Sequence, residues 1–132
     1  MPVPEGKKAD PKDIATSFLK LAASGKVSEA FEKYVSRQDF RHHNPHFPGD
    51  AKSLRAAMME AHQKFPRTTL EVQHVFEGED LVAVHSRVQH ASNTLTIAAV
   101  HMFRFDERNR IAELWDVAME APQDSPNENG MF

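Results

Sequence analysis

The first apolar pattern in the chain has the spacing of an amphipathic helix. Ile14, Phe18 and Leu21 recur at i, i+4 and i+7. Asp10-Pro11 precedes them and supplies an N-cap carboxylate followed by proline at the first helical position. Ser24-Gly25 is a pair that ends helices. We therefore predict a first helix between these two dipeptides.

Two further helices follow, separated by an irregular stretch. The shorter one is predicted over residues 27–35, with its apolar residues on one side. Residues 36–49 contain two closely spaced prolines, which break regular structure. Asp50 can cap a third helix that runs to about Phe65, where Pro66 stops it.

The second half of the chain alternates apolar and polar residues with the period of two that strands require. Short polar turns separate the alternating runs. We predict four strands, over residues 70–77, 81–90, 95–105 and 110–119.

Helices followed by an antiparallel meander predict an α+β fold. Three N-terminal helices would pack on one face of a curved antiparallel sheet, and together they would form a conical barrel with an internal pocket. We assign residues 10–121 to this domain. Residues 1–9 are predicted to be a flexible leader and residues 122–132 a C-terminal tail.

The last hairpin carries the most informative polar residues. If residues 106–109 form a four-residue loop, His101 and Asp116 share a face as diagonal neighbours, because side chains alternate along a strand. A three- or five-residue loop would place them on opposite faces. Their shared face is the more apolar one, which suits acid–base chemistry. Trp115 has the opposite parity and is predicted to point outward, where an exposed aromatic residue favours a dimer interface.

The preceding hairpin leaves two alternatives for His85 and Arg87. A three-residue loop over residues 91–93 would place His85 opposite Ala99, on the face of His101, and Arg87 would go with it. A two-residue loop would turn both side chains away from that face.

Composition narrows the class of function. A chain of 132 residues with 40% hydrophobic residues suits one folded domain. The net charge of −3 gives no electrostatic reason to expect nucleic acid or a membrane surface as a partner. The absence of cysteine excludes disulfides, thiolate metal sites and thiol catalysis. The N-terminus lacks the apolar core of a signal peptide, and we expect a cytoplasmic protein.

Residues 42–46, His-His-Asn-Pro-His, form the densest polar cluster, on a predicted loop. Asn44 could orient a substrate carbonyl, or it could support the local turn before proline. His42 and His46 are expected at the surface. A metal site built from His42, His46, His85 and Asp116 is a further alternative. Because no spacing matches a known metal signature, we predict no metal.

Several of these features together resemble a known family. His43-Asn44-Pro45 after the second helix, and Phe103-Arg104-Phe105 leading through a polar turn into residues 111–116 (Ile-Ala-Glu-Leu-Trp-Asp), resemble SnoaL-like polyketide cyclases of the nuclear transport factor two-like superfamily. The ending from Ala121-Pro122 to residues 129–132 (Asn-Gly-Met-Phe) is similar to a subgroup described as predicted aldol-condensation enzymes. The resemblance covers about residues 12–132.

The resemblance implies a homodimer formed through the outer sheet face and chemistry without a cofactor. It also implies aldol-type cyclisation or isomerisation, with a catalytic Asp on the last strand and a His on the strand before it. These positions match Asp116 and, within about one residue, His101. The steroid isomerases of the superfamily also use a tyrosine on the first helix, and the chain's one tyrosine, Tyr34, is on the second.

We therefore predict that Asp116 is the general base and that His101 donates to the enolate oxygen or relays the proton. His43, Asn44, His85 and Arg87 are the predicted substrate-binding residues. The structural alternatives are a carboxylate satisfied by helix ends and a core histidine. A non-catalytic ligand-binding or dimeric scaffold domain of the same fold is the alternative function.

Overall fold

The computed structural model describes residues 9–91 and 95–132. Eight of the nine residues of the predicted leader lie outside this range, as does most of the turn after residue 90. None of the helices in the described part of the chain is long and apolar enough to cross a bilayer.

The three predicted helices are present, and two are capped as their sequences suggest. Helix α1 spans Pro11–Ala23, and the Asp10 side chain accepts a hydrogen bond from the backbone N–H of Lys12 (3.0 Å). Helix α2 spans Val27–Tyr34 and α3 spans Ala51–Lys64. The Asp50 carboxylate caps α3 by accepting from the backbone N–H of Ser53 (3.2 Å). Such caps satisfy N–H groups that have no partner within the helix.

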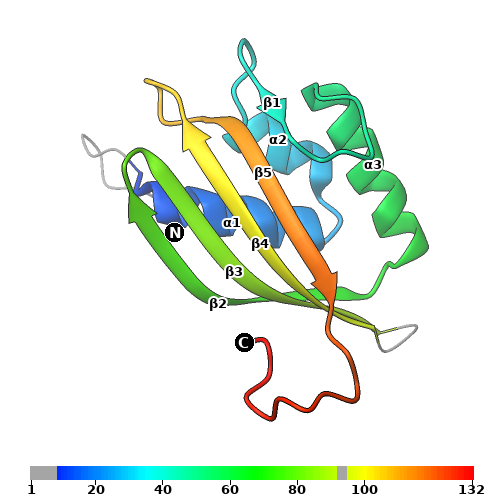
Figure 1. The fold of residues 1–132 in the computed structure, drawn as a ribbon. Helices are drawn as coiled ribbons and strands as arrows, with labels where there is room; N and C mark the ends of the chain where they lie inside the picture. Colours follow the sequence, from blue (N-terminus) through cyan, green and yellow to red (C-terminus); the bar gives the residue numbers. More distant parts are fainter. Residues whose placement is uncertain (1–8, 92–94) are drawn as a thin grey trace.

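Within residues 9–91 and 95–132 the sheet has five strands, one more than predicted. Their bounds are β1 Arg41–His42, β2 Thr68–Gly78, β3 Leu81–His90, β4 Thr96–Phe105 and β5 Ile111–Glu120. The spatial order is β1-β5-β4-β3-β2, with β1 parallel to β5 and the other neighbours antiparallel (Figure 1). β1 is only two residues long, too short for a periodic pattern, and therefore the sequence did not reveal it.

The helices cover one face of the sheet, which we call the inner face (Figure 1). Val82, Val84, Phe103 and Leu114 project from it into the core that the helices complete. Phe18 of α1 is fully buried against this face, with its ring centroid 6.1 Å from that of Phe103 in an edge-to-face arrangement. The predicted α+β architecture is confirmed, although the curved sheet stays open and does not close into a barrel.

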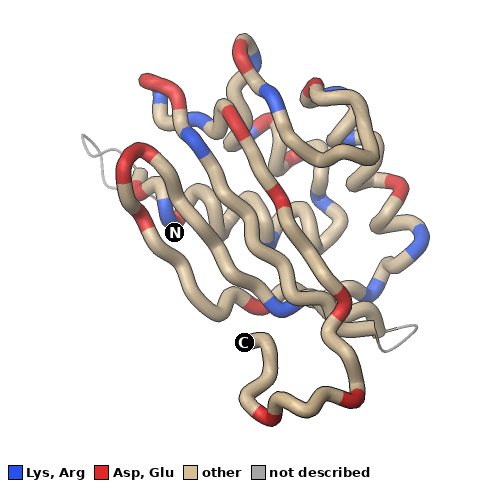
Figure 2. Tube along the Cα trace, in the orientation of Figure 1, with Lys and Arg blue, Asp and Glu red and all other residues tan. Residues whose placement is uncertain are grey.

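The opposite, outer face carries a different set of side chains. Val100, Val117 and Met119 are exposed there, and Trp115 also points to this side. Most of the Lys, Arg, Asp and Glu positions lie at strand ends and loops, with acidic positions also within β5 (Figure 2). Residues 121–132 form no helix or strand.

Candidate active site

The register of β4 and β5 brings His101 and Asp116 together on the inner face. The two residues are direct cross-strand partners, and His101 also pairs with Val84 of the core. Opposite residues in an antiparallel pair share a face. The prediction that His101 and Asp116 lie on one face is confirmed, and they are closer than the predicted diagonal arrangement.

The loop behind this register differs from the prediction. Asp106 donates its backbone N–H to the Arg110 carbonyl (2.8 Å), which closes a five-residue turn, not the predicted four-residue one. Phe105 pairs with Ile111 but Arg104 pairs with Glu113, which leaves Ala112 as an extra residue in β5. This bulge reverses the change of parity that a five-residue loop would cause. Two compensating irregularities therefore give the predicted face.

His101 is held in an apolar environment. Burial lowers the pKa of His101, and the nearby charge of Asp116 opposes this shift only in part. Its Nδ1 atom is buried and has no hydrogen-bond partner among the described residues. The Oγ atom of Ser86, on the same face of β3, is also buried without a partner there. Buried polar atoms without partners are uncommon and concentrate at functional sites.

Asp116 is fixed from the neighbouring loop. Asn44 donates from Nδ2 to Asp116 Oδ2 (3.1 Å), while its Oδ1 accepts the backbone N–H of His46 (3.0 Å). The second bond is the local turn expected of Asn before proline. Asn44 therefore does both: it supports the turn and holds the carboxylate. Whether it also contacts a substrate stays a prediction.

His43 lies on the other side of β5 from Asn44. Its ring stacks on Trp115 with a centroid distance of 5.0 Å and an interplanar angle of 4°. Because Trp115 points to the outer face, His43 does not share the inner face with His101 and Asp116. His42 was expected at the surface, but it is buried. Its Nε2 donates to the Pro48 carbonyl (2.6 Å) and its Nδ1 accepts the backbone N–H of Asn44 (3.1 Å).

A buried carboxylate that we did not predict anchors this loop. The Glu113 side chain is only 4% exposed and accepts hydrogen bonds from His43 Nε2 (2.6 Å), Arg41 Nε (2.8 Å) and Arg104 Nε (2.9 Å). Burial would raise the pKa of Glu113, but these bonds outweigh it and lower the pKa to about 2. The sequence did contain a signal for Glu113. It lies three residues before Asp116 on the same strand, so the two carboxylates point to opposite faces of the sheet.

His85 and Arg87 also lie on the outer face. Ser86, not His85, pairs with Ala99, so the alternative in which His85 and Arg87 share the face of His101 is wrong. His85 Nδ1 instead lies 3.0 Å from His74 Nδ1 of β2. A one-residue change of register moves every side chain of a strand to the other face.

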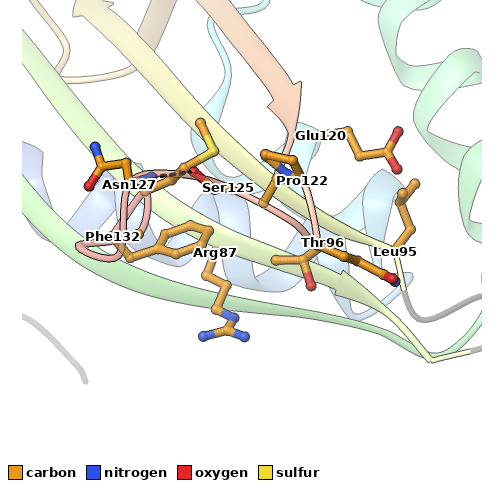
Figure 3. Close-up of a pocket in the computed structure, with 12 residues that line it drawn as sticks. Arg87, Leu95, Thr96, Glu120, Pro122, Ser125, Asn127 and Phe132 are labelled. Carbon is orange, nitrogen blue, oxygen red and sulfur yellow. Dashed lines mark hydrogen bonds between the residues drawn. The ribbon is translucent and has the colours of Figure 1, made fainter.

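The C-terminal tail meets these two residues. The ring of Phe132 stacks on His85 (5.7 Å), and the Arg87 guanidinium lies 5.3 Å from its centre. Between the tail and strands β3 to β5 is a hollow of about 390 Å³, lined in part by Arg87, Thr96, Glu120 and Phe132 (Figure 3). Neither His101 nor Asp116 lines it.

The inner face has its own cavity, of about 270 Å³, and His101 lines it. The helices contribute Leu19, Ala22, Ala23, Met58, Ala61 and His62, and Phe65 follows the end of α3. The strands contribute Thr68, Leu70, Val88 and His90. We did not predict roles for His62 and His90. Their signals were present, since His62 follows Met58 by one helical turn and His90 has the parity of Val88. His101 lines this cavity, and Asp116, which does not line it, is the cross-strand partner of His101. The cavity and this pair together define the candidate active site.

The residues considered for a metal site do not converge. His85 is on the outer face and His42 is bonded to backbone groups. In the part of the chain that the structure describes, no three His, Asp or Glu side chains form a group that could hold a metal ion.

Comparison with known proteins gives the same fold. A family model described as "SnoaL-like domain" matches residues 15–114. The chain belongs to the SnoaL-like family. No curated protein matches it by sequence.

Solved SnoaL-like structures superpose well at low identity. IdmH from Streptomyces antibioticus, described as a candidate polyketide cyclase, has a TM-score of 0.67 and 20% identity, covering 83% of this chain and 92% of its own. A candidate polyketide cyclase from Acidithiobacillus ferrooxidans has a TM-score of 0.70 and 18% identity, covering 89% and 91%. A SnoaL-like protein of unknown function from Burkholderia thailandensis has a TM-score of 0.67 and 17% identity, covering 92% and 100%. At these identities the likeness establishes the fold alone.

Proposed function

We propose that this SnoaL-like protein is an enzyme that removes a proton alpha to a carbonyl group, without a cofactor. In isomerisation, the enolate is then reprotonated at carbon by Asp116. In aldol-type cyclisation, the enolate carbon attacks a second carbonyl carbon of the same molecule, and the resulting alkoxide oxygen takes the proton back from Asp116. The observation that carries the proposal is the direct pairing of His101 and Asp116 on the inner face, where His101 lines a cavity of about 270 Å³. The polyketide-cyclase descriptions of its structural neighbours agree with this class of reaction.

Each residue has a defined part in the step. The Asp116 carboxylate accepts the proton from the alpha carbon, and the electrons of the C–H bond form the enolate. His101 is neutral near pH 7 because burial lowers its pKa, so its N–H can donate a hydrogen bond to the enolate oxygen. Asn44 holds the Asp116 carboxylate through the 3.1 Å hydrogen bond and orients it.

The test is exchange of deuterium from the buffer into a panel of cyclic ketones and β-dicarbonyl compounds. Asp116→Asn should lower the exchange rate by about 10²–10⁴-fold, the usual contribution of a positioned general base. Asp39→Asn, an exposed acid outside the site, is the matched control and should leave the rate unchanged. Undiminished exchange in Asp116→Asn would show that Asp116 is not the base.

The alternative is a ligand-binding domain without catalysis. The hydrogen bond from Asn44 to Asp116 favours it to some extent, because a carboxylate with a fixed donor can be purely structural. A compound that binds wild type and Asp116→Asn equally, with no exchange in either, would support this alternative.

We also propose that two copies of the chain meet through the outer face of β4 and β5, in a cytoplasmic homodimer. Val100 and Val117 are cross-strand partners there, and Val117 and Met119 are 71% and 58% exposed. Exposed apolar side chains grouped on one sheet face are typical of a protein–protein contact.

A further inference from the structure

The inner cavity is small for a ligand pocket. Its volume of about 270 Å³ lies below the range of about 300–1,000 Å³ typical of pockets for drug-sized ligands. A dry apolar cavity of about 150 Å³ holds one benzene molecule. The cavity is less than twice that size, so it has room for one or two fused rings and not for a tetracyclic molecule.

The cavity also lacks charge of the kind that an anion needs. None of its lining residues is Asp, Glu, Lys or Arg, and its ionisable groups are His62, His90 and His101. Burial lowers the pKa of His101, which keeps this ring neutral near pH 7. A carboxylate or phosphate inside the cavity would lose its hydration without gaining a cation, which costs several kcal/mol. The neighbouring Asp116 would add repulsion.

The cavity has few polar groups, and not all of them are free to form a hydrogen bond with a ligand. At one end Thr68 and His90 satisfy each other, with Thr68 Oγ1 2.8 Å from His90 Nδ1, and Thr68 also donates to the Phe65 carbonyl (2.8 Å). His101 has no hydrogen bond to any described residue, and its Nδ1 is enclosed. A ligand can therefore gain a polar contact at His101, and a second at His62, while the rest of it contacts mostly apolar side chains.

We propose that the cavity binds an uncharged, largely apolar molecule of one or two rings with a ketone oxygen placed at His101. This rests on the proposed function for the site and names its substrate class. A larger ring system would extend beyond the 270 Å³ of the cavity, and desolvation disfavours an acid group inside it. The reaction that supplies the substrate must therefore release a small neutral ketone, not an acid or a thioester still joined to a carrier inside the cavity.

Binding measured by calorimetry tests the proposal without requiring turnover. The probes are 2-tetralone, which is a neutral two-ring ketone, 2-naphthoate, which has the same two rings and a negative charge, and a four-ring steroid ketone. We expect 2-tetralone to bind at least tenfold more tightly than either of the others. Equal or tighter binding of the steroid or of 2-naphthoate, or no binding of 2-tetralone, would overturn the proposal.

Two variants locate the binding. Ala61→Phe and Ala22→Leu place larger side chains at the cavity wall and should weaken 2-tetralone binding tenfold or more. Ala56→Phe, on an exposed position of α3 that does not line the cavity, is the matched control and should bind normally. Unchanged affinity in both Ala61→Phe and Ala22→Leu, with thermal melting showing folded protein, would refute the location.

The outcome is separable from the proposed chemistry. If 2-tetralone binds selectively but exchanges no deuterium, the substrate class stands and the catalytic proposal fails. If exchange depends on Asp116 but the steroid exchanges as fast as 2-tetralone, the catalytic proposal stands and the size limit fails.

Discussion

Glu113→Gln tests how much the outer-face carboxylate stabilises the loop that holds Asp116. Glu113 is almost completely buried and accepts hydrogen bonds from Arg41, His43 and Arg104. His43 is adjacent to Asn44, which holds Asp116. Gln keeps the size of the side chain and removes the charge, so the variant isolates the electrostatic contribution.

The magnitude follows from the pKa. Lowering the pKa of Glu113 from 4.5 to about 2 corresponds to about 3 kcal/mol of folding free energy, at about 1.4 kcal/mol per pH unit. The cations are partly in water, with Arg41 69% exposed, and solvent screening reduces the expected value to about 2 kcal/mol. The folded-state pKa is depressed, so this stabilisation is complete above about pH 4.5 and is lost as the pH falls towards 2.

The assay is urea unfolding of wild type and Glu113→Gln at a series of pH values from 7 down to 2.5. The difference in unfolding free energy should be about 2 kcal/mol at pH 7 and should shrink steadily below pH 4.5. Glu71→Gln, at an exposed position of β2, is the control and should show almost no difference at any pH. A difference for Glu113→Gln that stays constant over the whole pH range would refute the electrostatic reasoning.

Three further predictions concern the site and the outer face. Asn44→Ala should lower kcat about tenfold with little change in KM, because Asn44 acts through Asp116; a raised KM at unchanged kcat would instead show that Asn44 binds substrate. In wild type, unfolding free energy should fall as the pH drops below about 6.5, since neutral buried His101 has a lowered pKa and resists protonation that the unfolded chain accepts. His101→Leu should lose that part of the slope, and equal slopes would contradict the assignment. Val117→Glu should convert a dimer to a monomer in analytical ultracentrifugation, and a wild-type monomer at high concentration would disprove the outer-face dimer.

The order of elements and most of their boundaries could be predicted from the sequence. The caps at Asp10 and Asp50 are local interactions that involve residues two or three positions apart, and the stripe of Ile14 and Phe18 depends only on helical period. The SnoaL-like resemblance was confirmed for the same reason, since it rested on the order of such local features. The two-residue strand β1 was missed because its pairing with β5 depends on contacts across about seventy residues.

The candidate site was predictable only where the alternation of side chains along a strand does not depend on the length of a loop. Alternation along β5 was enough to separate Asp116 from Trp115, whatever the loop did. The pairing of His101 with Asp116 needed a five-residue turn and the bulge at Ala112 to cancel, which the sequence could not specify. In the register between β3 and β4, Ser86 and not His85 pairs with Ala99. The His85 side chain, predicted for the inner face, therefore lies on the outer one.

The sequence by itself determined the α+β class, the helix caps and the division of β5 into two faces, because these follow from neighbouring residues and fixed periods. Only the tertiary structure decided which polar residues meet. Glu113 binds Arg41 and His43 from one segment and Arg104 from another, and the cavity wall comes from α1, α3 and three strands. Strand register and helix packing join residues distant in the chain, and no local pattern encodes their distances.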